Sequence, residues 1–116
     1  MALENNLLNK VSTSDILRLM EKLGIPETSV RYGNDCLIFP TICHNTIDND
    51  PSHKLYYYES SKRFYCYTSC KSMSVFDFII NVYKTRGFKM EFIRAYNMLD
   101  EIVSGRMKNG FAVIQS

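Results

Sequence analysis

The sequence feature that most constrains the fold is a set of four potential metal ligands placed around a short aromatic segment. Cys43-His44 precedes this segment, and Cys66 and Cys70 follow it with three residues between them. Structural zinc sites use thiolate and imidazole ligands, and two ligand pairs joined by a β-hairpin form a zinc ribbon. The spacing therefore predicts one Zn²⁺ ion held by Cys43, His44, Cys66 and Cys70.

The fourth ligand is open at this point, because adjacent side chains diverge unless the backbone turns sharply. This makes His53 the alternative to His44. If Tyr58 pairs near Arg63 across the hairpin, His53 falls opposite Thr68, close to the Cys66–Cys70 pair. A further alternative is that Cys66 and Cys70 are buried thiols and that both histidines lie on the surface.

The chain has 116 residues, a formal net charge of +2 and no apolar stretch long enough to span a bilayer. Its first residues carry no secretory signal pattern. We therefore expect a single cytoplasmic domain over residues 1–116, with a core at about 12–104. In that reducing compartment four cysteines are metal ligands or buried thiols more often than disulfides.

Hydrophobic periodicity and capping residues predict the main elements. We expect helices over about 13–23, 74–86 and 89–104, a strand over 35–39, and a β-hairpin that joins 55–58 to 64–67. The first eleven residues are expected to be a loosely structured lead-in, and 105–116 a C-terminal strand or a linker. The sequence thus predicts an α+β fold, in which a small zinc-ribbon hairpin or antiparallel sheet packs with about three helices.

The order of these pieces resembles the N-terminal zinc-binding domain of bacterial-type DNA primases, in the divergent form found in phages and mobile elements. The parallels are Cys43-His44, Asp50-Pro51-Ser52, Lys54 to Tyr58, Arg63 to Cys70, and Val75-Phe76-Asp77-Phe78-Ile79. The resemblance covers about residues 12–104 and depends on the joint order of its motifs. Thr41 stands where the family has a cysteine ligand, so Cys43 would be the metal ligand instead.

The resemblance implies a DNA-binding module of the primosome that holds single-stranded template for primer initiation in DNA replication. Its partners would be single-stranded DNA and a primase catalytic domain or a helicase or polymerase, without a membrane. Aromatic rings stack on unpaired bases while cations meet phosphates. The candidate residues on and beside the hairpin are Lys54, Tyr56, Tyr58, Lys62, Arg63, Tyr65, Tyr67 and Lys71. Alternatively, the tyrosines are half-buried and pack against neighbouring side chains, and the lysines are solvated residues of the surface.

The sequence lacks the signals of a catalytic centre. Primer synthesis needs clustered carboxylates that hold divalent metal ions, and the acidic residues here are scattered. There is also no glycine-rich phosphate loop. We therefore expect this chain not to be an enzyme by itself. The alternative function is a zinc-containing adaptor that recruits or modulates replication proteins, and a weaker option is a zinc-free helical domain.

Overall fold

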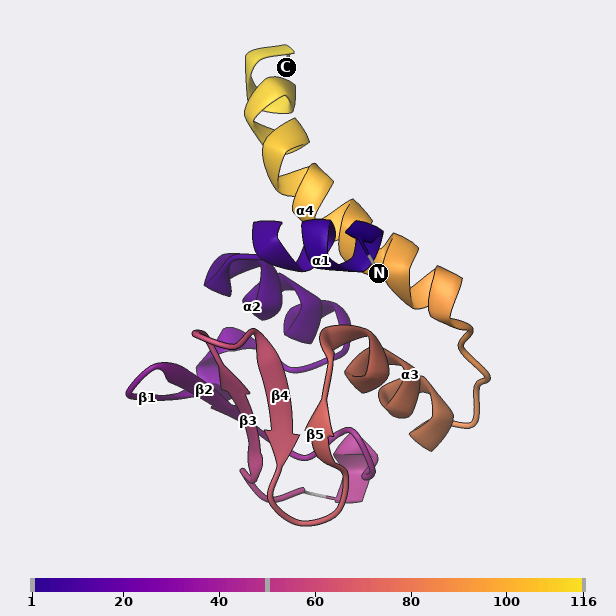
Figure 1. The fold of residues 1–116 in the computed structure, drawn as a ribbon. Coiled ribbons are helices and arrows are strands. Elements are labelled where there is room, and N and C mark those ends of the chain that lie inside the picture. The colour runs from indigo at the N-terminus through magenta and orange to yellow at the C-terminus, as the bar shows by residue number, and fades with distance from the viewer. Residues whose placement is uncertain (1, 50, 116) are drawn as a thin grey trace.

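The computed structural model describes residues 2–49 and 51–115 (Figure 1). A five-stranded antiparallel sheet follows chain order, with β1 Arg31–Gly33, β2 Cys36–Phe39, β3 Leu55–Tyr58, β4 Arg63–Cys66 and β5 Lys71–Met73. The helices are α1 Ala2–Lys10, α2 Thr13–Lys22, α3 Val75–Thr85 and α4 Phe92–Gln115, with short 3₁₀ turns η1 Glu27–Ser29 and η2 Ile47–Asn49. This arrangement confirms the predicted α+β class. Asp50 and Ser116 lie outside the described residues.

The starts of α2 and α3 follow the capping signals in the sequence. The Ser12 hydroxyl accepts a hydrogen bond from the Asp15 amide at 3.2 Å, and the Asp15 carboxylate accepts one from the Ser12 amide. Ser74 and Asp77 repeat this reciprocal arrangement at α3. Each capping box satisfies amide groups that the first helical turn leaves without a partner. Gly87 ends α3 in the left-handed conformation with φ +88°.

Both ends of the chain differ from the prediction. The lead-in is a helix, α1, because Leu7 and Val11 are buried in the core and anchor it there. At the other end α4 begins at Phe92 rather than near Lys89 and continues to Gln115, so the strand expected for 105–116 is wrong over its described part. The alternative, a linker, stays a prediction. Gly105 does not adopt the left-handed conformation that ends many helices, so the helix continues through it.

The two faces of the sheet have different environments. On the inner face the side chains of Leu55, Tyr57, Phe64 and Cys66 are buried. Phe64 stacks on Phe78 of α3 with ring centroids 4.2 Å apart, which joins the sheet to the helical layer. Successive strand residues point to opposite faces, so the intervening residues form an outer face. No helix within the described residues is long and apolar enough to cross a membrane.

Candidate metal centre

The fold brings together the four side chains that the spacing predicted. One ligand atom from each of Cys43, His44, Cys66 and Cys70 lies within 4.8 Å of all the others. A tetrahedral zinc ion with bonds of about 2.0–2.3 Å holds its ligands roughly 3.5–3.8 Å apart, so a small contraction closes this cluster on a metal. Cys43 and Cys66 are buried, whereas His44 and Cys70 are partly exposed. The cluster can therefore bind a metal ion.

The β4–β5 turn positions two of these ligands. Cys66 ends β4 and Cys70 directly precedes β5, so the antiparallel pairing returns the second thiol toward the first. The Ser69 amide donates to the Cys66 sulfur at 3.5 Å, and the Thr68 hydroxyl lies 3.3 Å from it. The turn also lies at the end of the sheet opposite α1 and α2 (Figure 1).

These hydrogen bonds change the acidity of the first thiol. Burial alone would raise the pKa of Cys66. The Thr68 hydroxyl and the backbone amides of Cys70, Ser69 and Thr68 outweigh burial and lower this pKa to about 6, because they stabilise the thiolate. Cys66 therefore offers a thiolate, the form that binds metal, at neutral pH.

The other two thiols behave differently. Burial is the largest cause that raises the pKa of Cys43, and the neighbouring Cys70 and Cys66 raise it further. The pKa of Cys70 is also raised, first by burial and also by Cys66, although its contact with Cys43 acts in the opposite direction. Thiols crowded in this way cannot all ionise without a cation between them, so metal binding would release protons from them.

A tight turn allows Cys43 and His44 to reach one point although they are adjacent. The amides of His44 and Asn45 both donate to the Thr41 carbonyl, at 3.3 and 3.2 Å, which curls the chain within one turn. The Thr85 hydroxyl of α3 donates to the Cys43 carbonyl at 2.9 Å and ties this turn to the helix. This is the sharp backbone turn that adjacent ligands require.

Both ring nitrogens of His44 have neighbours that orient the imidazole. Nε2 lies 2.8 Å from the Thr68 hydroxyl, and Nδ1 lies 3.2 Å from the side-chain amide of Asn45. A metal takes one ring nitrogen, and the partner of the other nitrogen then fixes the ring. Sequence reasoning missed the positioning roles of Thr68 and Asn45. Both residues have polar side chains and lie within two positions of a predicted ligand, and this pattern could have indicated that they orient the ligands.

His53, the alternative fourth ligand, lies apart from the cluster. Its Nε2 is 2.8 Å from the Ser29 carbonyl of η1, so this ring joins the sheet to the segment that precedes β1. The predicted pairing of Tyr58 with Arg63 is present. However, β3 begins only at Leu55, so His53 is not part of the strand. The structure therefore gathers His44, and not His53, with the three cysteines.

The predicted tyrosines share the outer face of the sheet. Tyr56 pairs with Tyr65 across β3 and β4. The Tyr67 ring lies 4.9 Å from that of Tyr56 and 4.6 Å from that of Tyr65, measured between centroids. A hydrogen bond with the Tyr67 hydroxyl is the largest cause that raises the pKa of Tyr58 to about 12. The rings form one connected cluster in which Tyr67 is the most open, with 50% of its surface exposed.

The register extends this face across the whole sheet. Arg31 of β1 pairs with Ile38, Ile38 with Tyr56, and Tyr65 with Ser72, so one row crosses all five strands. Arg31 is exposed at the β1 edge of the sheet. Sequence reasoning missed β1 and therefore Arg31, although the Gly-Asn-Asp stretch before β2 was a turn signal for a preceding strand.

The predicted cations are divided among three locations. Arg63 pairs with Tyr58, and its guanidinium contacts the Ser72 hydroxyl at 3.1 Å, so it lies on the outer face. Lys54 and Lys71 are exposed near the turn that carries the metal ligands. Lys62 lies elsewhere, because its ammonium donates to the carbonyls of Asn9 and Val11 at the end of α1. The structure thus uses Lys62 as a tertiary contact.

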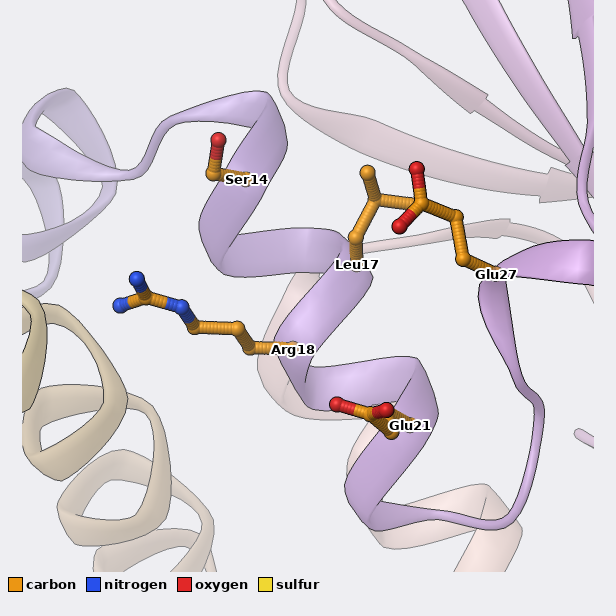
Figure 2. Close-up of a pocket in the computed structure, with 5 residues that line it drawn as sticks. All are labelled: Ser14, Leu17, Arg18, Glu21 and Glu27. Carbon is orange, nitrogen blue, oxygen red and sulfur yellow. The ribbon is translucent and has the colours of Figure 1, made fainter.

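A separate hollow on α2 and η1 carries no comparable set of ligands. It has a volume of about 300 Å³ and is lined by Ser14, Leu17, Arg18, Glu21 and Glu27. Figure 2 shows Glu27 beside Leu17, whereas Arg18 extends away from Glu27. Its charged groups do not converge on one point, so the metal cluster and the outer face are the candidate sites.

The chain is similar to the SPbeta prophage-derived uncharacterized protein YorJ of Bacillus subtilis (strain 168), with 30% identity over 102 residues. The aligned region covers 85% of this chain and 26% of YorJ, so the chain spans about a quarter of the length of this relative. No family model matches the sequence. No solved structure matches it significantly.

Proposed function

We propose that this chain is the zinc-ribbon module of a phage-type DNA primase, which binds single-stranded template DNA for primer initiation. The observation that carries the proposal is the proximity of a three-cysteine, one-histidine cluster to an open sheet face rich in tyrosine. The primase resemblance of the motif order and the likeness to a prophage protein support the same context.

Zinc is the metal that this donor set favours. Three thiolates and one imidazole in a tetrahedral arrangement match closed structural zinc sites, whereas Mg²⁺ and Ca²⁺ take oxygen ligands. The ion would join the turn at Cys43 to the β4–β5 turn, which are far apart in sequence. Its role in this proposal is structural, because all four positions are filled by protein ligands.

The outer face offers side chains that can bind single-stranded DNA. Tyr67 and its neighbours Tyr56 and Tyr65 offer aromatic surface to unpaired bases, and Arg63 and Arg31 lie on the same face to meet phosphates. In this proposal the chain holds template, and the phosphoryl-transfer step belongs to a catalytic domain or subunit outside it.

Two exposed tyrosines provide a matched test. Tyr67 is 50% exposed on the outer face, and Tyr32 is 60% exposed on β1 but belongs to the opposite face, because it pairs with the buried Leu37. We expect Tyr67→Ala to weaken binding of a fluorescein-labelled oligothymidine about tenfold or more, because one stacked base is worth roughly 1–3 kcal/mol. Tyr32→Ala should leave the affinity unchanged.

The measurement is fluorescence anisotropy at several salt concentrations, together with zinc analysis of the purified protein. One zinc per chain and an affinity that falls as salt rises would agree with the proposal. Equal affinities for the Tyr67→Ala and Tyr32→Ala variants would remove the outer face as the binding surface. A fully folded protein without metal would remove the zinc ribbon.

A further inference from the structure

Large apolar side chains are exposed at the connection between α3 and α4, away from the outer face. Phe88 is 63% exposed, Phe92 41% and Ile93 57%, all within one short stretch of chain. Phe92 is partly supported by the Phe76 ring, with centroids 5.1 Å apart. Clustered apolar surface of this kind marks interaction sites on soluble domains.

A groove lies beside this stretch, between the ends of α2 and α3 and one side of α4. It consists of two adjoining hollows of about 270 and 190 Å³, which share Tyr83, Met90 and Arg94 as lining residues. Met98 lines the larger hollow and Phe88 the smaller. The methionines and Tyr83 are half-buried. Methionine side chains adapt to different apolar partners, which suits a floor for a peptide side chain.

The charges around the groove are mostly positive. Lys22, Lys89 and Arg94 are exposed and line it, and Glu101 is the acidic lining residue among those that the structure describes. Arg86 lies close by, where its guanidinium donates to the Leu23 carbonyl at the end of α2. An apolar floor with a cationic rim complements an acidic segment that carries an apolar side chain.

We propose that this groove binds an acidic peptide segment of a partner protein. An apolar side chain of the peptide would contact Tyr83, Met90 and Met98, and its carboxylates would face Lys22, Lys89 and Arg94. A nucleic acid strand fits less well, because the groove is lined by two aromatic side chains, Tyr83 and Phe88, and two thioethers rather than by a connected row of rings on which bases stack. The site is independent of the metal cluster and of the outer face.

The test is an NMR titration of the ¹⁵N-labelled full chain with a synthetic peptide in which Asp and Glu flank a central Leu-Phe pair. We expect amide shifts to concentrate at the groove residues. The Arg94→Glu variant should bind this peptide about tenfold more weakly, since it replaces attraction by repulsion at the rim. Arg18→Glu makes the same charge reversal at an exposed residue of α2 outside the groove, and this variant should bind like the unaltered protein.

Two control peptides distinguish specific binding in the groove from binding elsewhere on the protein. A peptide with Ala in place of Leu-Phe should lose most of the affinity, and one with Lys in place of Asp and Glu should not bind. Absence of shifts up to millimolar peptide, shifts outside the groove, or equal weakening by Arg94→Glu and Arg18→Glu would overturn the proposal. It would also be overturned if oligothymidine displaced the peptide from the groove. Zinc content and oligothymidine affinity of Arg94→Glu should remain unchanged.

Discussion

At the scale of single residues, Thr68 connects two of the candidate ligands. Its hydroxyl lies 2.8 Å from His44 Nε2 and 3.3 Å from the Cys66 sulfur. Replacing it by valine keeps the shape of the side chain and removes both polar contacts. Because such outer partners orient the ligands, we expect Thr68→Val to weaken zinc affinity about 10-fold or more, measured by competition with a chromophoric chelator.

The neighbouring Ser69 provides the control for this prediction. Its contact with the Cys66 sulfur comes from the backbone amide, so Ser69→Ala keeps that hydrogen bond. Both Thr68 and Ser69 are exposed, and the two substitutions remove one hydroxyl each. Equal zinc affinities for Thr68→Val and Ser69→Ala would show that the Thr68 hydroxyl does not position the ligands.

At the scale of secondary-structure elements, the two ends of the hairpin region serve different purposes. Lys62 lies in the β3–β4 turn with φ +57°, and its ammonium holds the end of α1 through two carbonyl groups. Lys71 begins β5 with φ +62° and is exposed beside the metal cluster. The two lysines therefore share an unusual backbone conformation and differ in what their charges contact.

This difference predicts opposite effects of the same substitution. Lys62→Met should lower the free energy of unfolding by about 1–3 kcal/mol, because it removes charged hydrogen bonds at the end of a helix, and should leave oligothymidine affinity unchanged. Lys71→Met should leave the free energy of unfolding within about 0.5 kcal/mol and weaken oligothymidine binding only slightly, because Lys71 pairs with the buried Cys66 and therefore belongs to the face opposite Tyr67. Urea denaturation and fluorescence anisotropy of both variants measure these effects, and the reverse pattern would contradict them.

The predictions from sequence succeeded best for elements whose signals are local. The capping boxes at Ser12 and Ser74 and the aromatic hairpin were predictable because each depends on residues a few positions apart. The helix α1 was not, because its stability comes from burial of Leu7 and Val11 against distant elements. The short strand β1 was missed because three exposed residues carry no hydrophobic pattern.

At the scale of the whole molecule, the metal cluster and the hydrophobic core hold different parts of the fold. The core joins the inner face of the sheet to the helices, for example through Phe64 and Phe78. The four ligands lie on two turns at one end of the sheet. Removal of the metal should therefore loosen this end first and leave the helices formed.

Chelation of the purified protein tests this division. We expect the thermal midpoint to fall by more than about 10 °C, since a ligand at 1,000 times its dissociation constant adds roughly 4 kcal/mol. Helical circular dichroism at room temperature should persist. Cys66→Ser should lack the response to chelator, whereas Cys36→Ser, which alters a buried cysteine outside the cluster, should retain it. Similar responses of the two variants would contradict the assignment of the ligands.

The sequence by itself determined the fold class, the capped helices, the hairpin and the three cysteines of the cluster, because these follow from local pattern and ligand spacing. Only the tertiary structure decided between His44 and His53, since the turn at Thr41 and the path of the chain before β3 place one ring in the cluster and the other on Ser29. It also separated Lys62 from the other cations. Such choices depend on contacts between residues far apart in sequence, and these contacts form only when the core packs.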